Sequence, residues 1–133
     1  MAKFKYTFTV CLTILLAGCG GVAFLPKPLA QDARGIALVD GTPYNCKTLG
    51  EIEGSDEVAG RVGATYNTLR KGAYNDLRNE AVAVAGNGKR ITLRILNEVA
   101  ICGYGNSLYY CDKANLPIHS FRIKAQIFEC GEK

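Results

Sequence analysis

Apolar and polar residues alternate over two long stretches in the second half of the chain. In residues 90–101 and again in residues 120–130, nearly every second side chain is apolar. A period of two is typical of strands with one buried and one wet face, so we expect two long antiparallel strands. If this period holds, Cys102 and Cys130 lie on the face away from the apolar side chains, where a disulfide could join them.

A different spacing marks residues 67–85, where apolar residues recur every three or four positions. These residues are Leu69, Ala73, Leu77, Ala81, Val84 and Ala85. The spacing predicts one amphipathic helix, capped at its start by Asn67 or Thr68 and ended by a Gly-Asn-Gly stretch. Because the apolar stripe is rich in alanine, we expect this helix to pack closely against a sheet.

Shorter segments complete the expected domain. Residues 36–39 suggest an edge strand, and residues 45–52 predict a further strand. The glycine-rich residues 54–63 predict a surface loop and lack the Gly-Lys-Ser/Thr of a phosphate-binding loop. Residues 103–117 predict an irregular excursion between the two long strands. The whole pattern predicts an α+β fold, with a small, mostly antiparallel sheet of three to four strands and one main helix on one face.

The start of the chain has the features of an export signal. Lys3 and Lys5 precede an uncharged run, residues 6–17, which is shorter than the ~20 residues that span a membrane. The following Leu-Ala-Gly-Cys, ending at Cys19, resembles the lipobox of bacterial lipoproteins. The resemblance implies cleavage before Cys19, diacylglycerol on its sulfur and usually a third acyl chain on its amino group. The alternative is an uncleaved anchor with an ordinary cysteine.

This interpretation divides the chain into three parts. We expect residues 1–18 to be a signal peptide, residues 19–35 a lipid-anchored tether held extended by its prolines, and residues 36–133 a single domain. The residue after the acylated cysteine is Gly20 and not aspartate. By resemblance to enterobacterial sorting rules, the expected location is the bacterial outer membrane, with the domain facing the periplasm.

Charge and cysteine content narrow the classes of function. The formal net charge is +4, and removal of the two signal lysines would leave +2, which is too weak to predict a nucleic-acid partner. Four cysteines would remain beside the acylated one: Cys46, Cys102, Cys111 and Cys130. In a small exported domain they favour two disulfides, with three possible pairings. A four-thiolate zinc site is the competing interpretation, but it usually has cysteines two residues apart. We therefore expect no metal and no cofactor.

Three segments of the chain resemble a known family. Residues 71–81, KGAYNDLRNEA, resemble the central helix of a family of small uncharacterised bacterial lipoproteins, the YjeI-like proteins, which are distantly similar to the Rcs envelope-stress lipoprotein. CKTLGEIEG, beginning at Cys46, resembles the first strand of that family. QIFEC, ending at Cys130, resembles its closing strand. The resemblance covers about residues 39–130, apart from the middle.

The resemblance also implies a disulfide pairing. The two cysteines shared with the family match Cys46 and Cys130, so it implies a bridge between the first and last strands. Cys102 and Cys111 would then form a local bridge across the excursion, which looks like an addition to the family core. The rival pairing, Cys46–Cys111 with Cys102–Cys130, stays open.

Three clusters are candidate contact surfaces. Four basic residues would share the exposed face of the sheet if the long strands are neighbours: Arg90, Arg94, Arg122 and Lys124. They could bind phosphate groups or an acidic partner, although solubility is the simpler explanation. The excursion supplies three candidate contact anchors: Tyr104, Tyr109 and Tyr110. Residues 75–79, NDLRN, form either a recognition surface or ties to neighbouring loops, and we favour the ties.

Catalysis has little support in this sequence. His119 is the single histidine, and no nucleophile motif surrounds it or the adjacent Ser120. The first hypothesis is a non-catalytic envelope lipoprotein that contacts another envelope component, as a sensor or an assembly accessory. The second is a module that binds a small molecule or lipid on the basic sheet face, which a concave apolar pocket rimmed by the four basic residues would favour. A hydrolase would need His119 beside an acid and a nucleophile in a cleft.

Overall fold

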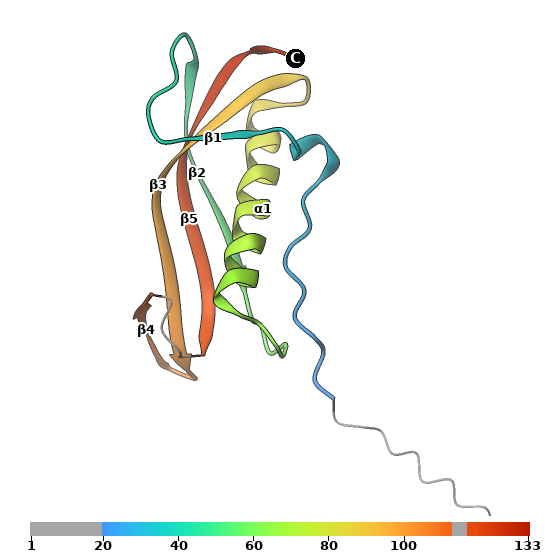
Figure 1. The fold of residues 1–133 in the computed structure, drawn as a ribbon, viewed down its shortest axis with the longest axis vertical. Coiled ribbons are helices and arrows are strands. Elements are labelled where there is room, and N and C mark those ends of the chain that lie inside the picture. Colours follow the sequence, from blue (N-terminus) through green and yellow to red (C-terminus); the bar gives the residue numbers. More distant parts are fainter. Residues whose placement is uncertain (1–19, 113–116) are drawn as a thin grey trace, which may run out of the picture.

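Two layers make up the described part of the chain, residues 20–112 and 117–133 of a computed structural model: one long helix and a five-stranded, mostly antiparallel sheet (Figure 1). The elements are η1 (Gln31–Ala33), β1 (Ala37–Val39), β2 (Lys47–Glu57), α1 (Tyr66–Ala85), β3 (Lys89–Tyr104), β4 (Ser107–Cys111) and β5 (Ile118–Glu132). The α+β class predicted from the sequence is confirmed. The predicted signal peptide, residues 1–18, and Cys19 lie outside the described residues.

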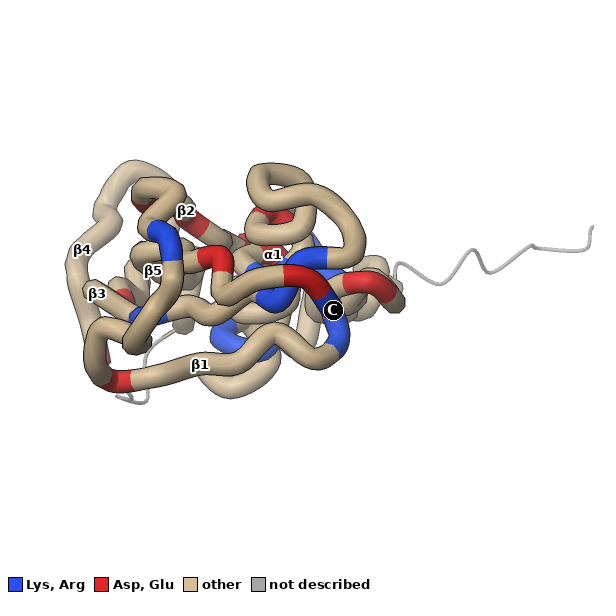
Figure 2. The backbone as a smooth tube through the Cα atoms, turned by 90° about the horizontal axis from the view of Figure 1, so that it is seen from above, with Lys and Arg blue, Asp and Glu red and all other residues tan. Residues whose placement is uncertain are grey.

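The sheet has the strand order β1-β3-β5-β2, and β4 pairs with the C-terminal end of β3. β1 pairs with β3 in parallel, whereas the other pairs are antiparallel. Within the described residues the sheet has five strands, not three to four, because the predicted excursion after β3 folds back as β4. Basic and acidic residues are interspersed in the view along the long axis (Figure 2).

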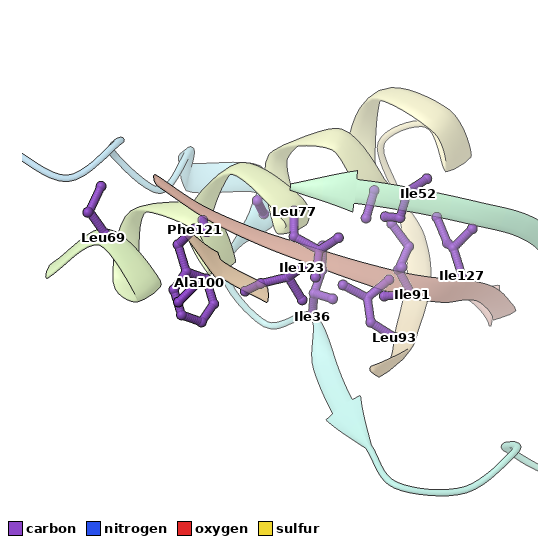
Figure 3. Close-up of a cluster of buried hydrophobic side chains, with 14 of the residues drawn as sticks. Ile36, Ile52, Leu69, Leu77, Ile91, Leu93, Ala100, Phe121, Ile123 and Ile127 are labelled. Carbon is purple, nitrogen blue, oxygen red and sulfur yellow. The ribbon is translucent and has the colours of Figure 1, made fainter. Parts of the chain in front are cut away.

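The helix α1 lies where the sequence pattern predicts it. Thr65 is its N-cap and exchanges hydrogen bonds with Thr68, which forms a capping box, so the predicted cap is displaced by a few residues. The fully buried side of the helix consists of Leu69, Ala73, Leu77 and Ala81. Figure 3 shows the helix leucines among the core side chains of the sheet. Val84, predicted to belong to the stripe, is exposed near the helix end.

Gly54 of β2 lies directly against the backbone of α1. A Cβ atom at this position would lie 2.4 Å from the backbone nitrogen of Leu77 and 2.5 Å from the carbonyl oxygen of Ala73. Any larger residue would therefore push the helix and strand apart. β2 continues to Glu57, so the prediction of a loop over residues 54–63 was wrong in its first part. The glycine there serves close packing and not flexibility.

A β-bulge in β3 reverses which side chains face the helix. The register of β3 against β5 shifts between Ile95 and Asn97. Beyond the shift, Ala100 pairs with the core residue Phe121, and Cys102 is buried. The prediction that Cys102 lies on the face away from the helix was therefore wrong, because one extra residue in a strand exchanges its two faces.

Two disulfides close the described part of the chain in different ways. Cys46–Cys130, which we name the closing disulfide, joins the start of β2 to the end of β5 over a sequence separation of 84. Cys102–Cys111, the hairpin disulfide, joins β3 to β4 over a separation of 9. This is the pairing that the family resemblance implied, and the rival pairing is excluded.

The segment predicted as a tether lies against the domain in its described part. Its backbone is extended along α1 (Figure 1), and Phe24 and Ala33 are buried. Ala23 forms a parallel bridge with Val62, in the loop after β2. The segment differs from a free tether because two of its apolar side chains, Phe24 and Ala33, are buried in the core. No helix within residues 20–112 and 117–133 is long and apolar enough to cross a membrane.

Candidate functional site

The four predicted basic residues divide into two pairs at different places on the sheet. Arg90 donates to the carbonyl oxygen of Cys130 at 3.0 Å, and Arg94 donates to the hydroxyl of Thr42 at 3.1 Å. Both arginines therefore make local contacts, Arg90 at the closing disulfide and Arg94 with the segment between β1 and β2. Arg122 and Lys124 lie further along β5, and Arg122 is four residues from the partner of Arg94, which corresponds to ~13 Å along a strand.

Arg122 and Lys124 line a small cavity on the outer face, by which we mean the face of the sheet away from α1. Its volume is about 190 Å³, and its remaining lining residues are Glu53, Asn97, Val99, Ile101 and Tyr110. Lys124 also lies 4.0 Å from Glu51. The surroundings are thus part apolar and part acidic. The structure brings two of the four basic residues to one cavity and leaves the other two outside it.

A larger cavity, of about 450 Å³, lies at the end of the sheet where β2 gives way to its following loop. Its lining residues are Lys27, Ser55, Asp56, Glu57, Ala59, Arg61, Ile101, Leu108, His119, Ser120 and Arg122. The wall combines three cations, two carboxylates and two aliphatic side chains. Most of these residues were not singled out from the sequence, because they come from four separate segments of the chain.

Asp56 is the buried charge of this wall, with 2% of its surface exposed. Its carboxylate accepts hydrogen bonds from the backbone nitrogens of Lys27 at 3.0 Å and Glu57 at 2.9 Å, and the guanidinium of Arg61 lies 4.0 Å away. Gly72 of α1 leaves the space for it: a Cβ atom there would lie 1.8 Å from the Asp56 carboxylate. Asp56 therefore fixes the N-terminal segment to the domain. The sequence signal for this contact is the glycine inside the helix.

His119 lacks one of the contacts that a catalytic triad needs. Its Nδ1 atom is buried and has no hydrogen-bond partner among the described residues. In a triad one imidazole nitrogen contacts the nucleophile and the other contacts the acid. The backbone of His119 has a structural contact, because its carbonyl oxygen accepts from the nitrogen of Val58 at 2.9 Å. The arrangement of the described residues is therefore not that of a triad.

The predicted tyrosines are on the β3–β4 hairpin. Tyr110 is 82% exposed, and Tyr104 and Tyr109 are also exposed. Tyr109 and Tyr110 line a surface pocket of about 350 Å³ together with Ile101 and Leu108. Tyr104 lies at the tip of the hairpin, next to the turn. Because the hairpin disulfide holds the two strands together, these side chains project from a rigid support.

The NDLRN segment of α1 ties the helix to its neighbours. The Asn75 side chain donates to the carbonyl of Lys27 at 2.8 Å, and Asn79 bonds to the backbone of Pro28 and Ala30, each at 2.9 Å. Asp76 accepts from the backbone nitrogen of Ser55 at 2.9 Å and pairs with the ammonium of Lys27 at 3.1 Å. The structural role favoured from the sequence is confirmed for these three side chains.

Glu98 of β3 binds two side chains of α1, and the bulge in β3 brings it there. The bulge turns it toward α1, where it accepts hydrogen bonds from Tyr74 and, at 2.8 Å, from Arg70. Burial, together with the bond to Glu98, raises the pKa of Tyr74 to about 12. By the alternation predicted for residues 90–101, Glu98 would share the wet face of the strand with Arg90 and Arg94; this is wrong for the same reason as for Cys102.

No group of three or more His, Cys, Asp or Glu side chains that could hold a metal ion is present within the described ranges.

Comparison with known proteins identifies a family and no characterised relative. No curated protein and no solved structure matches the chain. A family model described as a domain of unknown function, DUF4156, matches residues 27–130, which include α1, strands β1 to β4, most of β5 and both cysteine pairs. The chain therefore belongs to the DUF4156 family.

Proposed function

We propose that this protein is an exported bacterial lipoprotein that acts without catalysis, by contacting another component of the cell envelope. The observation that carries the proposal is the presence of the closing and hairpin disulfides, because structural disulfides persist in oxidising compartments outside the cytosol. The lipobox-like sequence ending at Cys19 supports the same compartment. A role as sensor or assembly accessory rests on the resemblance to YjeI-like proteins and, distantly, to the Rcs lipoprotein.

The surface that we propose for this contact is the hairpin patch, defined as Ile101, Leu108, Tyr109 and Tyr110. Its exposed aromatic side chains project from strands held by a disulfide, so little conformational entropy is lost when they are covered. Arg122 lines both neighbouring cavities and is a candidate for pairing with an acidic group of the partner. A rigid aromatic patch beside a cation is typical of protein contact sites.

The anchor and the compartment are tested by the intact mass of the protein extracted from membranes. We expect residues 19–133 plus acyl chains, with four thiols that react with an alkylating agent only after reduction. A mass that still includes residues 1–18, or four thiols that react without reductant, would contradict the proposal. A Cys19→Ala variant is the matched control, because it should lose the acyl mass and keep both disulfides.

The contact is tested by photocrosslinking in living cells. A photoreactive amino acid at Tyr110 should give one defined adduct, which Arg122→Glu should weaken. The same probe at Val84, exposed near the end of α1, is the control and should not give that adduct. Adducts of equal yield from both positions would show that the hairpin patch has no selective partner.

The second candidate function is binding of an anionic amphiphile. The cavity of about 450 Å³ favours it, because the cations Lys27, Arg61 and Arg122 lie around the aliphatic side chains of Ile101 and Leu108. Native mass spectrometry with a short-chain phosphatidylglycerol tests it. A bound lipid that is lost in Leu108→Asp and kept in Val84→Asp would favour this function, and equal binding by the two variants would reject it.

A further inference from the structure

The described chain is fixed to the domain almost immediately after Cys19. The carbonyl oxygen of Val22 accepts from the backbone nitrogen of Val62 at 2.9 Å, and the nitrogen of Phe24 donates to the carbonyl of Val62 at 2.7 Å. Only Gly20 and Gly21 separate Cys19 from Val22. Three steps between Cα atoms span at most ~11 Å. A group attached to Cys19 is therefore held close to the loop that contains Val62.

Large apolar side chains are exposed at this place. Val22 is 73% exposed, Leu25 is 72% exposed and Val62 is 53% exposed. We name these three residues the anchor-side patch. Two cations come from the same two segments: Arg61, whose guanidinium is 4.8 Å from the centre of the Phe24 ring, and the partly exposed Lys27. Exposed apolar side chains on segments that also carry cations suit a lipid surface of acyl chains and anionic headgroups.

The β3–β4 hairpin lies at the same end of the molecule. In Figure 1 the hairpin, the loop after β2 and the first described residues occupy one end of the long axis, and β1 and the C-terminus occupy the other. The hairpin tip carries the exposed Tyr104. Tyrosine is enriched where proteins meet the headgroup layer, because its ring is apolar and its hydroxyl is polar. This end of the molecule thus presents both the exposed apolar residues of the anchor-side patch and the exposed Tyr104 of the hairpin.

We infer that this end of the domain rests on the lipid surface that holds Cys19, with the anchor-side patch in the headgroup layer. The inference rests on the proposed acylation of Cys19, because the Cα atom of the acylated residue then lies within ~11 Å of the Cα atom of Val22 in the patch. It gives the domain a fixed orientation, with its long axis directed away from the membrane. The hairpin patch then lies near the lipid surface, so the proposed partner is one that reaches this level.

The test uses the absence of tryptophan from the sequence. Leu25→Trp and Val62→Trp each introduce a single reporter into the full acylated chain. Tyr44→Trp is the matched control, because Tyr44 is 90% exposed in the segment between β1 and β2, at the opposite end. Each variant is placed in vesicles of phosphatidylcholine and phosphatidylglycerol with brominated acyl chains. The Val62 side chain packs against Gly21, so the exchange Val62→Trp also changes that contact. Leu25→Trp is included as a second reporter that is independent of it.

We expect the two patch reporters to lose most of their emission to the brominated lipid and to shift to shorter wavelength, while the control stays unquenched. Quenching of patch and control reporters to the same small extent would overturn the inference. An emission shift without quenching, which grows with protein density, would assign the patch to a second copy of the chain and also overturn it. The mass of each preparation is measured first: loss of acylation overturns the proposed function, whereas an acylated but unquenched chain overturns this inference alone.

Discussion

Replacing Gly72 by alanine should destabilise the domain, although the same exchange stabilises most helices. At an ordinary helical position alanine is favoured over glycine by ~1 kcal/mol. Here the new Cβ atom would lie 1.8 Å from one carboxylate oxygen of Asp56 and 2.8 Å from its Cγ atom. The carboxylate is buried, so it cannot turn into water. The methyl group must displace it from the hydrogen bonds that it accepts.

The size of the effect follows from these bonds. Asp56 accepts from the backbone nitrogens of Lys27 and Glu57. Each hydrogen bond to a charged group contributes ~1.5–3 kcal/mol. Loss of both, offset by the gain in helix propensity, gives a net loss of ~2–5 kcal/mol. A domain of this size is stable by ~5–15 kcal/mol, so the change is large enough to measure.

Equilibrium unfolding in guanidinium chloride, followed by far-ultraviolet circular dichroism, measures this loss. The control is the same exchange in an Asp56→Ala background, where the carboxylate is absent and Gly72→Ala should cost little. Ala83→Gly, at an exposed position of the same helix, reports plain helix propensity and should cost ~1 kcal/mol. The reasoning is refuted if Gly72→Ala stabilises the protein, or if it costs the same with and without the Asp56 carboxylate.

Three further predictions concern other contacts. Replacing both cysteines of the closing disulfide by alanine should lower the free energy of unfolding by ~4.6 kcal/mol, and the same exchange in the hairpin disulfide by ~2.6 kcal/mol. These values follow from the sequence separations of 84 and 9. Equal losses in the denaturant midpoints of the two variants would contradict this. Gly54→Ala should destabilise more than any exposed glycine-to-alanine exchange, because its Cβ meets helix backbone; thermal unfolding compares it with Gly41→Ala, which has open space. Tyr74 has its pKa raised from 10.0 to about 12, so the contribution of its neutral form is complete below pH 10 and is lost between 10 and 12. A tyrosinate absorbance titration should lose its highest step in Tyr74→Phe, and an unchanged highest step would refute the assignment.

The helix was predictable from the sequence because one local pattern determines it. From Leu69 to Ala81 the stripe of apolar residues fits a single face. Residues 81–85 are all apolar, so the pattern does not assign a face there, and Val84 is exposed. β3 was predictable only in its first half. Beyond the bulge, Val99 and Ile101 lie on one face of the strand, and Ala100 and Cys102 lie on the other. The residues on both faces are apolar, so the sequence does not specify which face points toward the helix.

The candidate site was predictable to the extent that it is local. The tyrosines and the hairpin disulfide come from one short segment, and the cysteine spacing marked it. The wall of the larger cavity was missed because its residues meet only after long-range packing. Lys27 and Asp56, for example, are 29 residues apart in the chain. Their meeting depends on Gly72, whose significance in the sequence becomes clear once the neighbouring helix face is known.

The closing disulfide limits how far the protein extends under mechanical load. Residues 46–130 form one covalent loop, so tension applied between the two ends of the chain cannot straighten it beyond Cys46. The segment before it, residues 20–45, is held by hydrogen bonds and burial and is the part that peels away. Fully extended, these 26 residues span ~90 Å. Under load the molecule therefore lengthens by a defined amount, while the strands between the two bridged cysteines carry no end-to-end force.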